Sequence, residues 1–433
     1  MGYALRHALA WVFLAATAAP ALAKPTTTTI FRFPGGKNGL TPVAGLIADS
    51  KGVLYGTTSA LNSRTHKVFG TVFSLTPPSG KTGQWTQSVL WRFRGGNDGA
   101  NPTSTLVMDG SGNLYGTTPV GNEHGTGTVF ELSPPSRGNS NWTETTIYAF
   151  NGFQDGTYPY AGLVRTSNGV MYGINGNGGA NGKGAIFQLS PPANGKGAWT
   201  ESVLYSFKGG SSDGEYPQGG LFLGSDGALY GTTQWGGIDG PYCGTDGNAG
   251  CGTVFKLAPP GNGSTQWTES VLYYFTGGPG GSAPLGNVIA DGSGNLFGTT
   301  NFGGVSFCCG IVFELSPPTG GGSTWSESTL YEFEAGSDGA NPSAGLLLGS
   351  NGILYGTAAT GGAFKSYGTV FSLTPPSGGG TTWSETTLHS FGEGNDGAIP
   401  LGNLFQGADG YLYGTTSKGG RPGHFGTVFR IAP

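Results

Sequence analysis

Short runs of alternating apolar and polar residues follow one another along the chain, separated by glycine, proline and aspartate. In one stretch, such runs occupy residues 104–108, 114–118, 127–132 and 143–150. A period of two predicts β-strands with one buried face, and the residues between the runs predict tight turns. No stretch shows the 3.6-residue spacing of an amphipathic helix. The pattern therefore predicts an all-β protein.

The group of four strands is repeated in tandem. The phrase Leu-Tyr-Gly-Thr-Thr, or a close variant, recurs at intervals of 57 to 67 residues, with its glycine at Gly56, Gly116, Gly173, Gly231, Gly298, Gly356 and Gly414. A regular period means that one supersecondary unit is copied along the chain. Four short strands per copy predict the blades of a β-propeller, and an open solenoid is the alternative.

The two ends of the repeat array complement each other. Residues 27–33 match the fourth strand of a unit, and residues 426–431 match the third strand of the seventh unit. The N-terminal strand is therefore expected to complete the last blade and to close the ring, which removes exposed strand edges. We predict one domain over residues 24–433, a seven-bladed β-propeller with four-stranded blades.

The recurring pattern Tyr-Gly-Thr-Thr, Gly-Gly, Gly-Thr-Val-Phe and Leu-x-Pro-Pro resembles the GloVer (Gloeo/Verruco) tandem repeat of secreted bacterial proteins. The match covers essentially all of the chain after its first residues, and the third copy (171–175) and fifth copy (296–298 and 310–313) depart most from the pattern. The resemblance implies export and a propeller-like fold. It implies no catalytic residues, because the family pattern is structural. Some members end in a surface-anchoring segment; this chain ends at Pro433 without one, so a released or periplasmic protein is expected.

The first 23 residues predict a secretory signal peptide. Arg6 and His7 precede the apolar residues 8–18, and small residues before Lys24 match a cleavage site after Ala23. No later segment is long and apolar enough to cross a membrane. We therefore expect a secreted or periplasmic protein, in a compartment where disulfides form.

Composition narrows the classes of partner. The chain has 86 glycines and 27 prolines, at fixed places in each repeat, so they indicate turns rather than disorder. Charged residues make up 10%, and the net charge is −4, so a nucleic-acid or anionic-membrane surface is not expected. No nucleophile elbow, phosphate-binding loop or zinc-type spacing is present. We therefore expect no cofactor and no metal, and a monomer.

Residues that recur in every unit are expected to serve the fold. The aromatic residue of each Leu-Tyr-Gly is expected to pack between blades, with a ligand ladder as the alternative. Six tryptophans precede the fourth strand and are expected to close the blade rim, with sugar stacking as the alternative: Trp85, Trp142, Trp199, Trp267, Trp325 and Trp383. The aspartates of the Gly-Gly-x-Asp-Gly loops indicate turns, with calcium as the alternative: Asp98, Asp155, Asp213, Asp338 and Asp396.

The loops between the second and third strands do not repeat faithfully. In a propeller they share one face with the loops that join successive blades. Ring closure makes blades 7, 1 and 2 neighbours, so their polar loop residues are predicted to gather on one sector: Arg64, His66, Lys67, Glu123, His124, Lys418, Arg421 and His424.

This sector suggests two kinds of chemistry. The candidates for an acid or a base are His66, His124 and His424, with Glu123 as a neighbour. The cations Arg64, Lys67 and Arg421 are candidates for binding an acidic sugar. The alternative is that these are ordinary solvated loop residues. No spacing indicates a metal site.

All four cysteines lie in two neighbouring repeats. Cys243 and Cys251 lie eight positions apart in the longest loop, and Cys308 is adjacent to Cys309. Three pairings remain open. Disulfides here are expected to stabilise long loops; alternatively they form the rigid wall of a binding site. Three aromatic residues would then offer stacking surfaces: Trp235, Tyr242 and Phe307.

Three classes of function fit these features. The first, which we favour, is a secreted binding protein that engages a carbohydrate or cell-envelope partner through its loop-rich face. The second is a polysaccharide-active enzyme, a lyase or glycoside hydrolase, that uses the histidine sector. The third is a structural envelope protein. Fold alone does not separate them.

Overall fold

The computed structural model describes residues 26–433, apart from short gaps at residues 60–68, 81–82, 137–139, 194, 196, 241, 244–249, 262, 306, 321–323, 365, 378–379, 393 and 421–422. The predicted signal peptide and its cleavage site lie outside the described residues. So do Arg64, His66, Lys67 and Arg421 of the predicted polar sector. No helix in the described part is long and apolar enough to cross a membrane.

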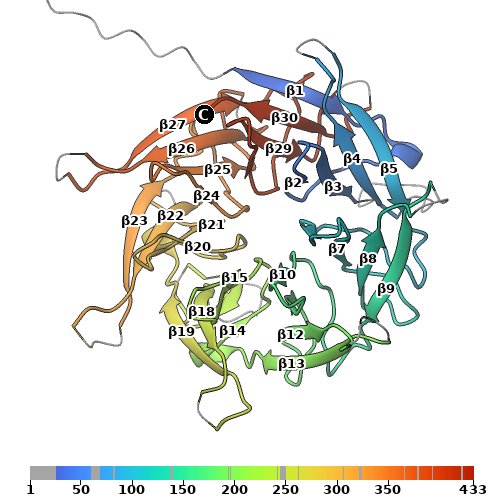
Figure 1. The fold of residues 1–433 in the computed structure, drawn as a ribbon. Coiled ribbons are helices and arrows are strands. Elements are labelled where there is room, and N and C mark those ends of the chain that lie inside the picture. The colour runs from blue at the N-terminus through green and yellow to red at the C-terminus, as the bar shows by residue number, and fades with distance from the viewer. Residues whose placement is uncertain are drawn as a thin grey trace, which may run out of the picture.

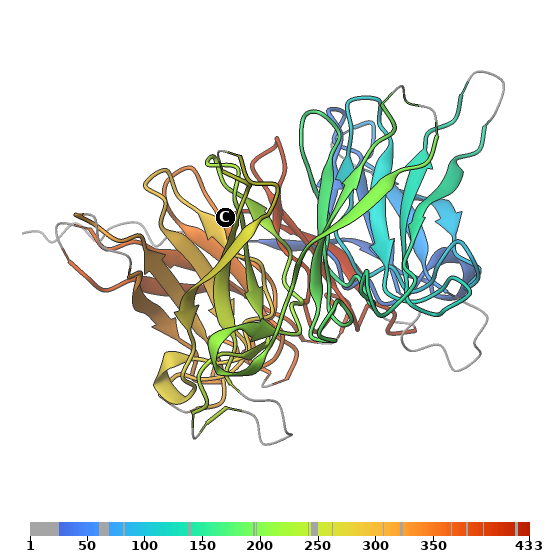
Figure 2. The ribbon, with the colours of Figure 1, turned by 90° about the horizontal axis from the view of Figure 1, so that it is seen from below.

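Seven antiparallel four-stranded sheets stand around a ring, which confirms the predicted seven-bladed propeller (Figure 1). Viewed from the side, the blades stand next to one another and loops project from both ends of the sheets (Figure 2). The described chain contains no α-helix, and only three short 3-10 turns: η1 (Gly36–Asn38), η2 (Gly210–Ser212) and η3 (Gly278–Gly280).

The strands of the blades follow chain order. Blade 1 contains β2 (Ile47–Ala48), β3 (Leu54–Thr58), β4 (Thr71–Thr76) and β5 (Thr86–Arg92); blade 2 contains β6 (Val107–Met108), β7 (Leu114–Thr118), β8 (Thr128–Ser133) and β9 (Thr143–Ala149); blade 3 contains β10 (Val164–Arg165), β11 (Met171–Asn175), β12 (Ala185–Ser190) and β13 (Thr200–Ser206). Blade 4 contains β15 (Phe222–Leu223), β16 (Leu229–Thr233), β18 (Thr253–Ala258) and β19 (Thr268–Tyr274), with an extra pair, β14 (Gly214–Glu215) and β17 (Trp235–Gly236). Blade 5 contains β20 (Ile289–Ala290), β21 (Leu296–Thr300), β22 (Ile311–Ser316) and β23 (Ser326–Glu332); blade 6 contains β24 (Leu347–Leu348), β25 (Leu354–Ala358), β26 (Thr369–Thr374) and β27 (Ser384–Ser390).

Blade 7 joins the two ends of the described chain, as predicted. It contains β28 (Phe405–Gln406), β29 (Leu412–Thr416) and β30 (Thr427–Ile431), and β1 (Thr27–Arg32) is its outer strand. The strands β1 and β30 pair antiparallel, from Thr27 opposite Ile431 to Arg32 opposite Thr427 (Figure 1). This pairing closes the ring.

The first strand of each blade is shorter than expected. The predicted run over residues 104–108 forms a ladder only at Val107–Met108. Ser104 does not pair in the ladder. Its carbonyl accepts a hydrogen bond from Thr57 Oγ1 of blade 1, and its Oγ accepts one from the Thr117 amide. The residues before the ladder therefore connect blades instead of extending the strand.

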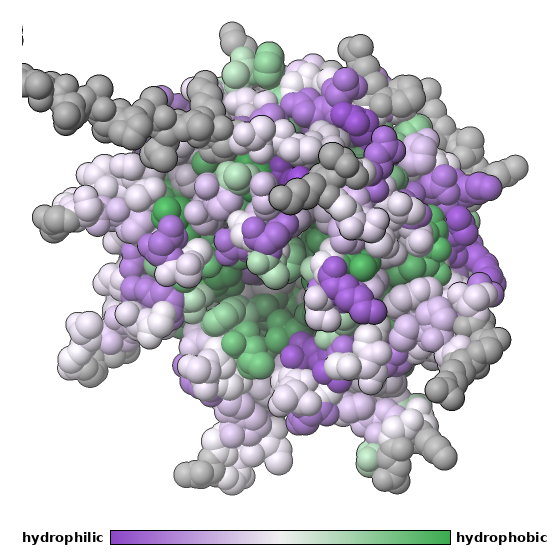
Figure 3. All heavy atoms as spheres, turned by 45° about the horizontal axis from the view of Figure 1, so that its top comes forward, coloured by the Kyte–Doolittle hydropathy of each residue, from purple (hydrophilic) through white to green (hydrophobic). Residues whose placement is uncertain are grey.

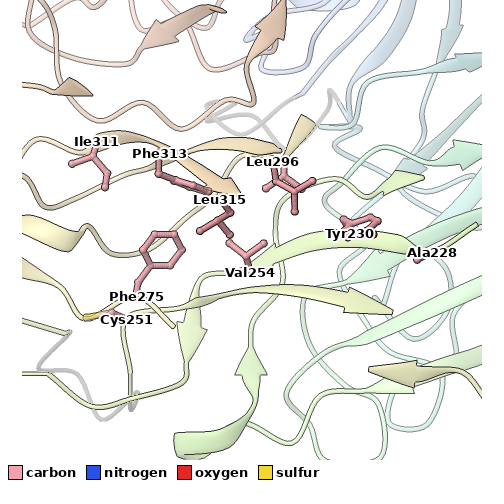
Figure 4. Packing of buried hydrophobic residues seen from close by; sticks show 10 residues of the cluster. Ala228, Tyr230, Cys251, Val254, Phe275, Leu296, Ile311, Phe313 and Leu315 are labelled. Atoms are coloured by element: carbon pink, nitrogen blue, oxygen red, sulfur yellow. The ribbon is translucent and has the colours of Figure 1, made fainter. Parts of the chain in front are cut away.

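The core between blades is built from the repeated phenylalanines. The last residue of each fourth-strand run packs edge-on against the phenylalanine of Gly-Thr-Val-Phe in the next blade, as in Phe275 and Phe313 (ring centroids 5.2 Å apart; Figure 4). The same pair recurs at every interface, at 5.1 to 5.2 Å. Repeating one buried aromatic contact around the ring gives each blade the same docking geometry.

The phenylalanine ring lies so close to the glycine of Leu-Tyr-Gly that a side chain there would overlap it. A Cβ on Gly116 would lie 2.7 Å from Cζ of Phe130, and a Cβ on Gly298 would lie 2.5 Å from Cζ of Phe313. No side chain fits at such a distance. Close approach to the ring therefore requires glycine at this position.

The two threonines of the same phrase have separate roles. Thr117 Oγ1 donates to the carbonyl of Ala161 in the next blade, and Thr118 Oγ1 lies 2.8 Å from Thr128 Oγ1 within its own blade. Equivalent bonds recur in other blades. In the third copy, Asn175 replaces the second threonine, and its Nδ2 donates to the Asp155 carbonyl. The motif thus satisfies buried polar groups between and within blades.

The tyrosines and tryptophans pack on each other across blade interfaces, as predicted for scaffold residues. Trp142 of blade 2 lies edge-on to Tyr55 of blade 1, at 6.4 Å between ring centroids. Four equivalent pairs lie within 5.7 to 6.3 Å. These contacts make the tryptophans part of the packing between blades.

Candidate functional site

The aspartates of the Gly-Gly-x-Asp-Gly loops act as turn acceptors. Asp155 accepts hydrogen bonds from the Tyr148 hydroxyl (2.9 Å) and from the amides of Asn151 (2.8 Å) and Gly152 (3.0 Å). Asp213 and Asp338 are bonded in the same way. Among the described residues, no group of three His, Cys, Asp or Glu side chains could hold a metal ion. The loops are thus built as turns.

His389 belongs to this same turn system. Its Nε2 lies 3.1 Å from Asp396 Oδ2, in the place where Tyr148 stands in blade 2. Burial acts to raise the pKa of Asp396, but the hydrogen bonds from His389 and from backbone amides hold it below its usual value. His389 therefore supports a loop.

One face of the ring is formed by two sets of loops. We call the loop between the second and third strands of a blade its 2–3 loop, and the loop that leads into its first strand its 4–1 loop. The two are bridged in most blades, as between Ala100 and Val120 or between Ser282 and Phe302. We call this side the loop-rich face.

The described members of the predicted polar sector are surface residues. Glu123 and His124 form a pair, with 3.5 Å between Oε1 and Nε2, and their side chains are 81% and 49% exposed. His424 is also exposed. None of these residues lines the three cavities described for the chain. Glu123 and His124 are consecutive in the sequence and their side chains are in contact in the structure. No cavity described for the chain encloses this pair.

The cysteines form two disulfides, Cys243–Cys251 in the 2–3 loop of blade 4 and Cys308–Cys309 in that of blade 5. Beside them, the rings of Tyr242 and Phe307 stack at 4.8 Å with an angle of 15° between their planes. Two predicted stacking residues from neighbouring blades are thus in direct contact. The third, Trp235, is only partly exposed in β17, where it pairs with Glu215 of β14.

A glycine allows this stack to lie close to the loop beneath it. Gly278 has φ 58°, and a Cβ there would lie 3.0 Å from Tyr242 and 3.1 Å from Phe307. Both rings remain half exposed, at 56% for Tyr242 and 50% for Phe307. The stack is therefore supported from below and open to solvent above.

Exposed large hydrophobic side chains are concentrated on the loop-rich face. Of nine such residues in the described chain, only Val203, in β13, lies on a blade strand. The other eight lie in 2–3 or 4–1 loops of blades 3 to 6: Phe153, Tyr160, Ile238, Tyr242, Phe302, Val305, Phe307 and Phe364. We call the five in blades 4 and 5 the apolar loop group: Ile238, Tyr242, Phe302, Val305 and Phe307. Exposed apolar groups of this kind mark interaction surfaces.

The centre of the ring offers little room. The central channel has a volume of about 300 Å³. Side chains bridge blades across it: Asn403 Nδ2 donates to Asn287 Oδ1 (2.8 Å), and the amide of Gly345 donates to Asn403 Oδ1 (2.8 Å). In the space-filling view, the visible face is hollowed at the middle of the ring and hydrophobic side chains line the hollow (Figure 3).

The largest of the three cavities described for the chain, about 1100 Å³, lies where blade 7 meets blade 1. We call it the seam groove. Trp85, Lys51, Asp49, Asp409 and Arg430 are among the residues that line it. Sequence reasoning missed this groove, although the signal was present: blade 7 is assembled from both ends of the array, so no hairpin joins its third and fourth strands.

Sequence reasoning also did not single out the half-buried glutamates of the fourth strands, whose pKa values are raised. Burial raises the pKa of Glu144, Glu201, Glu269 and Glu385 to about 7, and the aspartate of an adjacent loop adds to the effect. Their recurrence after the tryptophan in Trp-Thr-Glu or Trp-Ser-Glu was a visible sequence signal. Blade 1 has Gln87 instead, whose Nε2 donates to the Asn38 carbonyl (2.8 Å).

The fold and the loop-rich face define a seven-bladed β-propeller with an apolar loop group. The profile of the Gloeobacter/Verrucomicrobia repeat family matches residues 20–245 and 237–433, so the chain belongs to this family. This confirms the resemblance noted in the sequence.

Several solved structures resemble this chain at a low level of similarity. They include a protein of unknown function from Dyadobacter fermentans, at 11% identity over 95% of this chain and 99% of the other, with a TM-score of 0.46. An alpha-L-arabinanase from Penicillium chrysogenum, complexed with arabinobiose, has 13% identity over 84% and 99%, with a TM-score of 0.44. A gluconolactonase from Xanthomonas campestris has 12% identity over 78% and 87%, with a TM-score of 0.38. Similarity at this level carries no argument about function, and no curated protein matches the chain.

Proposed function

We propose that this protein is a secreted or periplasmic binding protein that holds a polysaccharide on its loop-rich face. The observation that carries the proposal is the exposed stack of Tyr242 and Phe307, within an apolar loop group fixed by two disulfides. Flat aromatic rings pack against the C–H faces of sugar rings, while hydroxyl groups of the sugar remain in water.

Rigidity supports this role. Each disulfide restricts a 2–3 loop, and Gly278 lets the stack lie directly on the loop below. A loop that is cross-linked before binding loses less conformational entropy when a ligand arrives. The two disulfides are also typical of proteins outside the reducing cytoplasm, in agreement with the predicted signal peptide.

The charge of the chain favours a sugar polymer over nucleic acid. With 10% charged residues and a net charge of −4, the protein lacks the cation density that phosphate backbones require. A neutral or weakly acidic polysaccharide can be held instead by ring stacking and hydrogen bonds.

Native affinity gels with a panel of neutral and acidic polysaccharides test the proposal. At least one polymer is expected to retard the protein. The double variant Tyr242→Ser and Phe307→Ser removes both rings, each worth about 0.5–1.5 kcal/mol in an aromatic contact. Its retardation should therefore weaken about tenfold or more. Val203→Ser removes an exposed apolar residue from a blade strand and should leave retardation unchanged.

Other outcomes redirect the assignment. Absence of retardation by every polymer contradicts the proposal and leaves a protein partner or a structural envelope role. Release of shorter sugars from any polymer favours the polysaccharide-active enzyme. In that case His124→Ala and His424→Ala are expected to abolish release while the thermal midpoint of unfolding stays unchanged.

A further inference from the structure

The seam groove is open because blade 7 is built differently from the others. In blades 2 to 6, the first proline after the third strand packs on the turn between the first two strands, as Pro191 does at 3.3 Å from a Cβ on Gly169. The corresponding turn glycines at the seam, Gly52 and Gly410, have no neighbour within 4 Å. No hairpin joins β30 to β1, so no strand connection of the described residues covers this side of blade 7.

The carboxylates in the groove are already satisfied. Asp49 accepts the amides of Lys51 (2.9 Å) and Val53 (3.0 Å) and the Tyr55 hydroxyl (3.2 Å). Asp409 accepts the Tyr411 amide (3.3 Å) and the Tyr413 hydroxyl (2.7 Å). Each therefore holds its own turn and has little capacity left for a ligand.

The cations Lys51 and Arg430 in the groove form no ion pairs with described carboxylates. Arg430 lies 4.7 Å from the centre of the Tyr411 ring and hydrogen-bonds the Tyr413 hydroxyl, and Lys51 is exposed on its turn. The contrast is Lys256, at the same place in the third strand of blade 4, which pairs with Asp226 at 2.8 Å. Blade 7 thus keeps a cation available where blade 4 neutralises it.

An aromatic wall completes the groove. Trp85 lies edge-on to Tyr413 at 6.1 Å, lines the cavity and is partly exposed. A volume of about 1100 Å³ is at the upper end of ordinary ligand sites. An indole beside two unpaired cations suits a ring-shaped ligand that carries a negative charge.

We propose that the seam groove binds a uronate unit of an acidic oligosaccharide, with Arg430 and Lys51 facing the carboxylate and Trp85 against the sugar ring. Guanidinium groups bind carboxylates through two parallel hydrogen bonds, which favours Arg430 as the principal contact. This site lies at the 1–2 turns, on the opposite side of the ring from the apolar loop group, and is independent of the function proposed for that group.

Isothermal titration with tetragalacturonate and with its fully methyl-esterified form tests the proposal. The free acid should bind at least tenfold more tightly than the ester, because esterification removes the charge and leaves the sugar rings. Arg430→Gln should weaken binding of the acid about tenfold. Lys256→Gln is the matched control and should leave it unchanged. Equal affinity for acid and ester, or an unchanged affinity of Arg430→Gln, overturns the proposal.

Two further variants keep the result unambiguous. Lys51→Gln changes an exposed turn residue and should weaken acid binding severalfold even if Arg430→Gln folds poorly. The loop-face double variant Tyr242→Ser and Phe307→Ser should bind tetragalacturonate as the unchanged protein does. If the loop-face variant instead abolishes binding of the acid, the ligand lies on the loop-rich face and the seam groove proposal is wrong.

Discussion

Tyr242 and Phe307 come from different blades, and their rings stack at 4.8 Å on the outside of the protein. The other inter-blade aromatic contacts described above recur around the ring. This contact is singular and exposed, and each ring is followed directly in the sequence by a disulfide-bonded cysteine, Cys243 or Cys308. A contact that does not serve the repeat is the part of the propeller on which function is expected to rest.

The Cys243–Cys251 disulfide is expected to stabilise the protein by restricting the unfolded chain. For a loop of this length, closure entropy predicts about 2–3 kcal/mol. The double variant Cys243→Ala and Cys251→Ala should therefore shift the urea midpoint of unfolding to lower concentration. It should also weaken polysaccharide retardation, because Tyr242 loses its anchored loop. An unchanged midpoint would mean that the 2–3 loop of blade 4 does not contribute to global stability.

The packing of Gly116 on Phe130 predicts a large response to one methyl group. Gly116→Ala places a Cβ 2.7 Å from the ring and should lower the free energy of unfolding by about 1–3 kcal/mol. Gly110→Ala is the control, since no atom lies within 4 Å of a Cβ there. Chemical denaturation of the two variants side by side measures the difference. Equal stability of both would contradict close packing at the repeated glycine.

Relief of a strained backbone position is expected to stabilise the protein. Ile399 has φ 57° before a proline, and a β-branched residue fits the left-handed region poorly. Blades 2 and 6 carry Asn101 and Asn341 at this place, with φ 57° and 56°. Ile399→Asn is thus expected to raise the free energy of unfolding by about 0.5–1 kcal/mol. The reciprocal change, Asn101→Ile, should lower it; calorimetric midpoints of both variants decide the matter.

The half-buried glutamates predict how stability depends on pH. Their pKa is about 7 in the folded protein and near the usual value for glutamate when unfolded, so the folded state holds extra protons between these values. The glutamate contribution to stability should therefore be fully present below the usual pKa of glutamate and should be lost as the pH rises through about 7. The aspartates with lowered pKa values titrate below this window and do not oppose the trend.

Replacing the four glutamates by glutamine isolates this effect. The variant Glu144→Gln, Glu201→Gln, Glu269→Gln and Glu385→Gln copies the residue that blade 1 already has at Gln87. It should be more stable than the unchanged protein at pH 8 and lose most of the decline between pH 5 and pH 8. Thermal midpoints across this range provide the measurement, and a decline of the same size in the variant would contradict the buried-glutamate explanation.

The fold was predictable because its information is repeated. Gly116 and its copies, the paired threonines and the complementary ends over residues 27–33 and 426–431 each occur in the sequence as a pattern. What the sequence could not provide are contacts between loops that do not repeat. Tyr242 and Phe307 are far apart along the chain, and the pairing of four cysteines depends on distances that only the folded loops define.

The seam groove shows a different limit of sequence reasoning. Ring closure was predicted from the ends, but a cavity results from the hairpin that blade 7 lacks, and Gly410 looks like any other turn glycine in the sequence. Likewise, the raised pKa of Glu144 comes from burial and from Asp98 of a neighbouring loop, both of which require the packed ring.

The most direct test of the central claim is a gel titration with the polysaccharide that retards the protein most strongly, comparing the unchanged protein with the Tyr242→Ser and Phe307→Ser double variant. The account predicts a dissociation constant at least about tenfold higher for the double variant, with Val203→Ser indistinguishable from the unchanged protein. Equal dissociation constants for all three proteins would show that the loops of blades 4 and 5 do not hold the ligand.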